Sequence, residues 1–123
     1  MSRIVVVDDS KLMRNLLQHL LEQAGHEVEP WADVAASEIP GRIKEGHPDL
    51  VITDYQMPGC NGLTVARMVR KVKPGLPIIV VTATHDPGMV EAMTRQEVSR
   101  ILYKPLKEEE LLTAVNEALA QPA

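Results

Sequence analysis

Short β-branched runs that end in polar residues recur along the chain and predict the strands of a sheet. The first run, residues 4–7, is followed directly by Asp8 and Asp9. Continuous apolar runs of this length are typical of parallel strands that are buried on both faces. The expected strands are residues 4–7, 26–31, 49–53, 77–82 and 100–104. The second of them contains Pro30, so we place it near an edge of the sheet.

Between these runs, apolar residues recur three and four positions apart, which predicts helices with one buried face. The expected helices are residues 11–24, a short or irregular segment within 32–47, then 63–72, 87–96 and 108–119. Asp9 or Ser10 can cap the first helix, and Gly25 can end it. Ser37 is the candidate cap of the second helix, with Pro40 in its first turn, where a missing N–H costs little.

Strands that alternate with helices predict an α/β fold, a five-stranded parallel sheet with helices on both faces. Right-handed crossovers leave few topologies for such a sheet. The chain has 123 residues, 45% of them hydrophobic. We expect residues 1–123 to form a single domain with a core that needs no metal or disulfide to hold it.

Charge and composition exclude several classes of function. The formal net charge is −4, and one Trp and two Tyr are the only aromatic residues. Both features argue against a nucleic-acid-binding protein, which uses basic patches and stacking rings. No apolar stretch approaches the ~18 residues of a membrane span. The single cysteine, Cys60, fits a reducing compartment. We therefore expect a cytoplasmic protein with neither nucleic-acid nor membrane partners.

Four of the five predicted strands finish with polar residues at their carboxyl ends. They are Asp8 with Asp9, then Asp54, Thr82 and Lys104. A single aspartate at such a place is usually a helix cap. The carboxyl ends of parallel strands, however, meet at one edge of the sheet, where ligands bind in folds of this class. Together these residues indicate a reaction centre.

Three aspartates in one crevice repel one another. At ~5 Å and an effective dielectric constant of ~20, each pair of carboxylates costs about 3 kcal/mol. Either one carboxyl stays protonated or a hard divalent cation binds. Lys104 can neutralise only one charge, so Mg²⁺ is the simpler solution, and such sites commonly hold phosphate oxygens. This favours phosphoryl chemistry with an aspartate as nucleophile, assisted by Thr82 and Lys104.

Four segments carry a resemblance to a known family over the whole chain. They are Val-Val-Asp-Asp-Ser (6–10), Pro-Asp-Leu-Val-Ile-Thr-Asp-Tyr-Gln-Met-Pro-Gly-Cys-Asn-Gly (48–62), Val-Thr-Ala (81–83) and Lys-Pro-Leu (104–106). In this order and at strand ends, they resemble the receiver domain of two-component response regulators. The resemblance implies a flavodoxin-like sheet of strand order 2-1-3-4-5 and a stand-alone, chemotaxis-type single-domain receiver.

The resemblance also assigns roles in a magnesium site. It implies that Asp54 is the phosphoacceptor and a metal ligand. Asp9 resembles a direct Mg²⁺ ligand, and Asp8 resembles a partner that acts largely through metal-bound water. Gln56 is similar in position to the residue whose backbone carbonyl completes the site.

Two further residues resemble the family's switch residues. Thr82 looks like the hydroxyl that moves toward the phosphoryl group, and Lys104 looks like its cationic clamp. The Lys104–Pro105 bond resembles one that is cis in the family. The implied donor is a phosphohistidine on a histidine kinase or a histidine phosphotransfer protein. Phosphorylation would switch binding to an unknown downstream protein. On this interpretation the protein is not an enzyme and catalyses only its own phosphotransfer and dephosphorylation.

The chain departs from the family pattern near the fifth strand. Receivers usually carry Tyr or Phe three residues before the lysine, where this chain has Ile101, and Tyr103 instead precedes Lys104 directly. Our hypothesis is that phosphorylation is read through loops and the fourth helix without rotation of a ring. Glu97 stands where the family usually has glycine.

Several alternatives remain open. The chain could be a degenerate receiver, a phosphate sink without a conformational output, or a fragment of a longer regulator whose linker starts at residues 121–123. A phosphatase of the haloacid dehalogenase type also uses a strand-end aspartate, but it needs two aspartates separated by one residue, and Asp8 and Asp9 are adjacent.

On the first helix, we expect the rim near Met13 and Leu17 to dock the phosphodonor.

Overall fold

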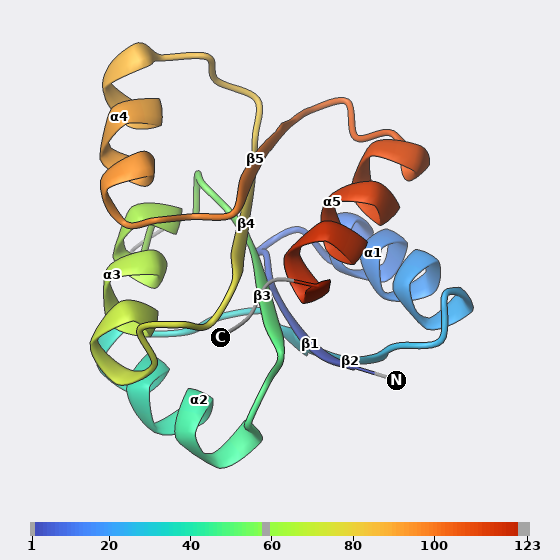
Figure 1. The fold of residues 1–123 in the computed structure, drawn as a ribbon, viewed down its shortest axis with the longest axis horizontal. Coiled ribbons are helices and arrows are strands. Elements are labelled where there is room, and N and C mark those ends of the chain that lie inside the picture. Colours follow the sequence, from blue (N-terminus) through green and yellow to red (C-terminus); the bar gives the residue numbers. More distant parts are fainter. Residues whose placement is uncertain (1, 58–59, 121–123) are drawn as a thin grey trace.

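Strands and helices alternate along the whole chain, as Figure 1 shows. The computed structural model describes residues 2–57 and 60–120, so Pro58 and Gly59 of the predicted loop and the possible linker start at 121–123 lie outside the described residues. The strands are β1 (Arg3–Val7), β2 (Glu27–Trp31), β3 (Leu50–Asp54), β4 (Ile78–Thr82) and β5 (Arg100–Tyr103). The helices are α1 (Lys11–Gln23), α2 (Ile39–Gly46), α3 (Gly62–Val72), α4 (Pro87–Arg95) and α5 (Glu108–Ala120), with a 3₁₀ turn η1 (Ala36–Glu38) before α2.

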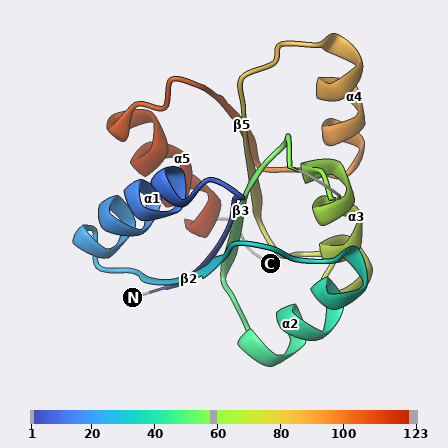
Figure 2. The ribbon, with the colours of Figure 1, turned by 180° about the vertical axis from the view of Figure 1, so that it is seen from behind.

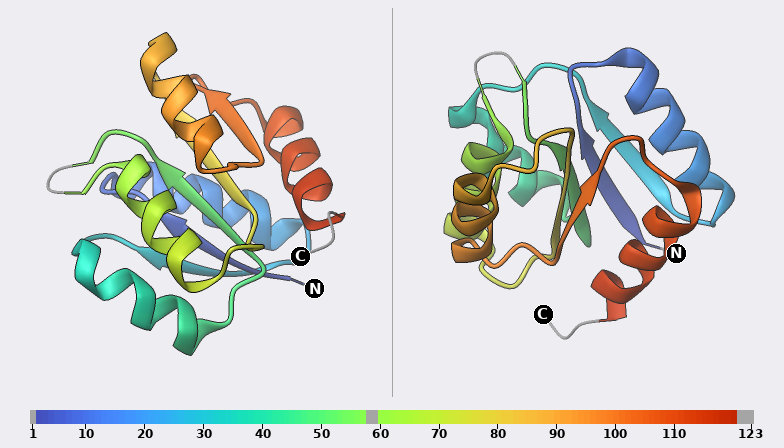
Figure 3. Two further views of the ribbon diagram at one scale, coloured as in Figure 1. Left: turned by 60° about the vertical axis from the view of Figure 1, so that its left-hand side comes forward. Right: turned by 90° about the horizontal axis from the view of Figure 1, so that it is seen from above.

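The five strands form one parallel sheet in the order β2-β1-β3-β4-β5. This confirms the α/β fold class and the strand order. The view from above in Figure 3 shows the strands side by side, and β2, which contains Pro30, lies at one edge as predicted. Parallel pairing brings the carboxyl ends of all five strands to the same edge of the sheet.

Helices cover both faces of the sheet. In Figures 1 and 2, α1 and α5 lie on one face, and α2, α3 and α4 lie on the other. Successive residues of β1 enter two different cores, because side chains alternate along a strand. Val5 and Val7 pack in the core on the α2–α4 side, whereas Ile4 and Val6 pack in the core on the α1–α5 side. This two-sided burial explains why the central strands β1, β3 and β4 have continuous apolar runs.

The start of α2 is the one helix start that was predicted wrongly. Ser37 does not cap the helix but lies inside η1, and the residue that precedes α2 is Glu38. The Glu38 carboxylate accepts a hydrogen bond from the backbone N–H of Ala35 at 2.9 Å, which stabilises the 3₁₀ turn. The Ile39 N–H donates to the Ala36 carbonyl and Pro40 has no N–H, so neither can donate to the Ser37 side chain as in a serine cap. Pro40 lies in the first turn of α2, as predicted.

Other boundaries differ by one or two residues. Asp54 is the last residue of β3, one position later than the predicted strand end, and it pairs with Val81 of β4. Lys104 follows β5 directly, and the Lys104–Pro105 peptide bond is cis, as the family resemblance implied. Over the part of the chain that the structure describes, no helix is both long and apolar enough to cross a bilayer.

Candidate functional site

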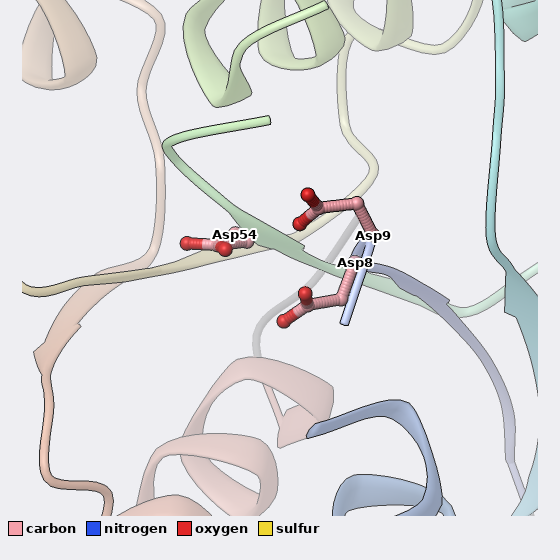
Figure 4. A group of neighbouring side chains, drawn as sticks. All are labelled: Asp8, Asp9 and Asp54. Atoms are coloured by element: carbon pink, nitrogen blue, oxygen red, sulfur yellow. The ribbon is translucent and has the colours of Figure 1, made fainter. Parts of the chain in front are cut away.

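The carboxyl ends of β1 and β3 bring three aspartates together. One carboxylate oxygen from each of Asp8, Asp9 and Asp54 lies within 4.8 Å of the others. In Figure 4 the carboxylates of Asp8 and Asp9 point toward the side on which Asp54 lies. The cluster predicted from the strand ends is therefore present.

Asp8 is the most deeply buried of the three aspartates, with 1% of its surface exposed. Its backbone N–H donates to the Trp31 carbonyl at 3.2 Å, and its Oδ1 accepts from the Ser10 N–H at 2.9 Å. Burial raises the pKa of Asp8, and repulsion from Asp54 and Asp9 adds to this rise, while the Ser10 bond and the charge of Lys104 oppose it. The pocket thus carries an excess of negative charge that a bound cation would relieve.

Asp54 lies between the other two aspartates and a single lysine. It is 7% exposed, and Lys104 Nζ lies 3.3 Å from Asp54 Oδ2. Because a positive side chain contacts one of its oxygens, Asp54 is oriented and partly neutralised before any ligand binds.

Thr82 lies at the end of the neighbouring strand β4, fully buried. Its Oγ1 accepts a hydrogen bond from the Thr84 N–H at 3.1 Å, and its carbonyl accepts from the Lys104 N–H at 2.8 Å. A hydroxyl that accepts one bond can still donate its proton. These contacts join Thr82 and Lys104 into one edge of the pocket.

The loop after Asp54 returns close to the strand end. Gly62, the first residue of α3, donates its N–H to the Tyr55 carbonyl at 2.8 Å. A Cβ at Gly62 would lie only 2.8 Å from the Asp54 carbonyl oxygen, so no larger residue fits here without a backbone shift. Asn61 caps α3, because its Oδ1 accepts from the Thr64 N–H at 2.9 Å. The Asn-Gly pair that ends the second matching segment therefore holds the start of α3 against the end of β3.

The donor set fits a magnesium ion. Three carboxylates within 4.8 Å supply the hard oxygen ligands that Mg²⁺ prefers, and one lysine cannot balance their charge. Gln56 lies in the loop two residues after Asp54, with its side chain exposed. The role expected for its backbone carbonyl stays a prediction.

One residue beside the pocket was missed by the sequence reasoning. Arg14 of α1 donates a hydrogen bond from Nη1 to the Asp8 carbonyl at 2.7 Å. Arg14 follows the Ser10 cap by four residues, and residues three and four apart lie along the same side of a helix. This spacing could have indicated that the Arg14 side chain reaches back to the turn before α1.

The predicted docking rim of α1 needs a correction. Leu17 is 1% exposed and belongs to the core, and Met13 is half-buried against the same core. The exposed apolar residues of α1 are instead Leu12, which is 82% exposed, and Leu16, which is 42% exposed. They lie four residues apart, which places them next to each other on the helix surface.

Comparisons with known proteins point to one family. The sequence model of the response regulator receiver domain matches residues 4–116. The chain is 34% identical over 119 residues to the DNA-binding transcriptional regulator NtrC of a Bradyrhizobium species, covering 97% of this chain but only 24% of that protein. It is 31% identical over 114 residues to the chemotaxis protein CheY of Thermotoga maritima, covering 93% of this chain and 94% of that protein.

Solved structures show the same fold. The chemotaxis protein CheY4 of Vibrio cholerae superposes with a TM-score of 0.86 at 28% sequence identity, covering 96% of this chain and 98% of that one. The chain thus spans about a quarter of its NtrC relatives and nearly the whole of its CheY relatives.

Proposed function

The chain belongs to the response regulator receiver domain family, and on that premise we propose that Asp54 accepts a phosphoryl group from a phosphohistidine in a reaction that requires Mg²⁺. The observation that carries this proposal is the setting of Asp54, with Lys104 Nζ 3.3 Å from one oxygen and the carboxylates of Asp8 and Asp9 within 4.8 Å. An aspartate so placed can act as a nucleophile toward phosphorus.

In the forward step, a carboxylate oxygen of Asp54 forms a bond to phosphorus while the nitrogen–phosphorus bond of the donor breaks. The electron pair of that bond returns to the imidazole nitrogen. Lys104 donates a hydrogen bond to a phosphoryl oxygen, and the Thr82 hydroxyl donates to another. Held by Asp8, Asp9, Asp54 and the expected Gln56 carbonyl, a magnesium ion would supply positive charge to the phosphoryl oxygens.

In the separate dephosphorylation step, a water oxygen forms a bond to phosphorus while the bond between phosphorus and the Asp54 oxygen breaks. The carboxylate of Asp54 is restored, and inorganic phosphate leaves with the protons of the water. In both steps, side chains of this protein assist a reaction at its own Asp54. The proposal therefore describes a self-modifying switch and not an enzyme with an independent substrate. It includes a cytoplasmic location, which the single cysteine favours.

The proposed partners are a protein that carries phosphohistidine and a downstream protein that distinguishes the two states. Leu12 and Leu16 of α1 form an exposed apolar pair that can receive an apolar helix of the donor. Ile101 is half-buried against the core on the α2–α4 side. We infer that the loop after Thr82, and not a ring at position 101, carries the signal to α4.

Phosphorylation by a small donor tests the proposal. The protein is incubated with phosphoramidate in Mg²⁺ or in EDTA, and the intact mass is measured. We expect the mass of one phosphoryl group to be gained in Mg²⁺, and not in EDTA or in Asp54→Asn. Asp33→Asn, which changes an exposed aspartate near the pocket, is the matched control and should gain the group normally. Equal labelling of Asp54→Asn would contradict the proposal, and turnover of a simple phosphate ester would favour a phosphatase.

A further inference from the structure

The turn between β1 and α1 brings two consecutive side chains to one place. Consecutive residues of a regular strand point to opposite faces of the sheet. Asp8 and Asp9 are consecutive, yet both carboxylates lie within 4.8 Å of Asp54 (Figure 4). Strand β1 ends at Val7, and the chain bends at Asp9. The orientation of the peptide that joins Asp8 to Asp9 therefore decides whether both side chains reach the pocket.

Arg14 holds that peptide. Its Nη1 donates to the Asp8 carbonyl oxygen at 2.7 Å, and a hydrogen bond from a charged donor is stronger than one between neutral groups. The Arg14 backbone N–H donates to the Ser10 carbonyl at 2.9 Å, so the side chain projects from the rigid first turns of α1. Together with the bonds from Asp8 to Trp31 and from Ser10 to Asp8, this contact fixes the carbonyl, the N–H and one carboxylate oxygen of Asp8.

We propose that Arg14 is a positioning residue for the magnesium site. Its bond to the Asp8 carbonyl keeps Asp8 and Asp9 in the one orientation in which both carboxylates can serve the same cation. Arg14 acts through these two residues and not on the phosphoryl group. This inference rests on the proposed function, because it concerns the metal which that function requires.

The positive charge of Arg14 makes the inference sharply testable. If the residue acted only as a charge near the pocket, it would repel Mg²⁺, and removing it would tighten Mg²⁺ binding. If it positions the ligands, removing it weakens binding although a repelling charge is lost. Groups that orient metal ligands typically change metal affinity about 10- to 100-fold when they are replaced.

The experiment is a calorimetric titration of the full chain with Mg²⁺. We expect Arg14→Met to weaken binding about 10-fold or more. Arg14→Lys should be intermediate, since an ammonium can donate to the carbonyl but lacks the planar fork of a guanidinium. Lys11, exposed at the first position of α1, provides the matched control for charge. Lys11→Met should bind Mg²⁺ as tightly as the wild type or slightly more tightly.

Arg14→Met that binds Mg²⁺ as tightly as Lys11→Met would overturn the inference. Circular dichroism and urea unfolding in EDTA show whether the variants are folded. If Arg14→Met does not fold, Arg14→Lys decides, because it keeps the charge and loses the guanidinium: weaker binding supports positioning, and wild-type affinity overturns it. Absence of Mg²⁺ binding by the wild type would contradict the proposed function itself.

Discussion

The imidazole of His85 stacks on the phenol ring of Tyr103, with the ring centroids 4.1 Å apart and the planes 11° from parallel. His85 lies in the loop between β4 and α4, three residues after Thr82, and Tyr103 ends β5 directly before Lys104. Tyr103 also pairs with Thr82 across the two strands. The stack thus ties the loop that follows Thr82 to the strand that presents Lys104.

A double-mutant cycle measures the strength of this tie. Aromatic pairs contribute about 0.5–1.5 kcal/mol beyond the burial of their surface. We expect His85→Ala and Tyr103→Ala to show a coupling energy of about this size in urea unfolding. Tyr103→Phe keeps the ring and should retain the coupling. A coupling energy near zero would mean that the two rings do not hold the loop.

Gly62 provides a test of how tightly the loop closes on Asp54. An added methyl group would lie 2.8 Å from the Asp54 carbonyl oxygen and 2.9 Å from Tyr55 Cα. Both are backbone atoms, so Gly62→Ala should lower the free energy of unfolding by about 1–3 kcal/mol and slow the phosphorylation of Asp54.

The matched control is Gly41→Ala in α2, where an added methyl group meets nothing within 4 Å. There alanine should stabilise the helix by up to about 1 kcal/mol. Equal effects of the two substitutions on stability, measured by urea unfolding, would contradict the close approach at Gly62.

Removing one carboxylate should stabilise the protein when no divalent ion is present. Because burial raises the pKa of Asp8, the folded protein binds the Asp8 proton more tightly than the unfolded chain does. The stability gained from this proton is complete below the unfolded value of about 3.9 and is lost as the pH rises through the folded pKa. Asp8→Asn, whose amide oxygen can still accept from Ser10, should therefore have the higher urea midpoint at neutral pH in EDTA.

The advantage of Asp8→Asn should shrink as the pH is lowered toward about 4. In Mg²⁺ the order should reverse, because the wild type gains stability from binding the ion and the variant lacks one carboxylate. A wild type that is more stable than Asp8→Asn in EDTA at neutral pH would show that the buried charge of Asp8 does not destabilise the folded protein.

The α1 surface should matter only for a protein donor. Leu12→Ser with Leu16→Ser removes the exposed apolar pair and should slow transfer from a phosphorylated histidine phosphotransfer protein about 10-fold, the effect of losing one strong interface contact. Labelling by phosphoramidate should stay at the wild-type rate, because the pocket is unchanged. Asn15→Ser, an exposed change on the same helix, is the control. Equal slowing with both donors would place the defect in the pocket.

Much of the fold could be predicted because the three central strands, β1, β3 and β4, are buried on both faces. Continuous apolar runs such as residues 50–52 are typical of a strand covered by helices on both faces. The start of α2 could not be predicted, because the choice between a serine cap and a 3₁₀ turn depends on a contact between Glu38 and the Ala35 backbone. Glu97 keeps a left-handed φ of 57°, so the backbone there retains the conformation that the family's glycine favours.

Most residues of the site could be predicted from the strand ends, but the exposed residues of α1 and the role of Arg14 could not. Polar residues at strand ends identify Asp8, Asp54 and Lys104, because parallel strands bring their carboxyl ends together. The apolar residues of α1 cover more of the helix surface than the core can bury, so the sequence does not show which of them face solvent. Leu17 was therefore predicted to lie at the surface, whereas Leu12 is the exposed residue. The bond from Arg14 to the Asp8 carbonyl could not be predicted from the spacing of apolar residues, because its acceptor is a backbone atom.

The position of the phosphoryl group tests the central claim most directly. Protein phosphorylated with phosphoramidate and Mg²⁺ is reduced with borohydride, which converts an aspartyl phosphate to homoserine, and its peptides are sequenced by mass spectrometry. We predict homoserine at Asp54 and at no other aspartate. Homoserine at Asp8 or Asp9, or label that is carried by a histidine and resists reduction, would contradict the account.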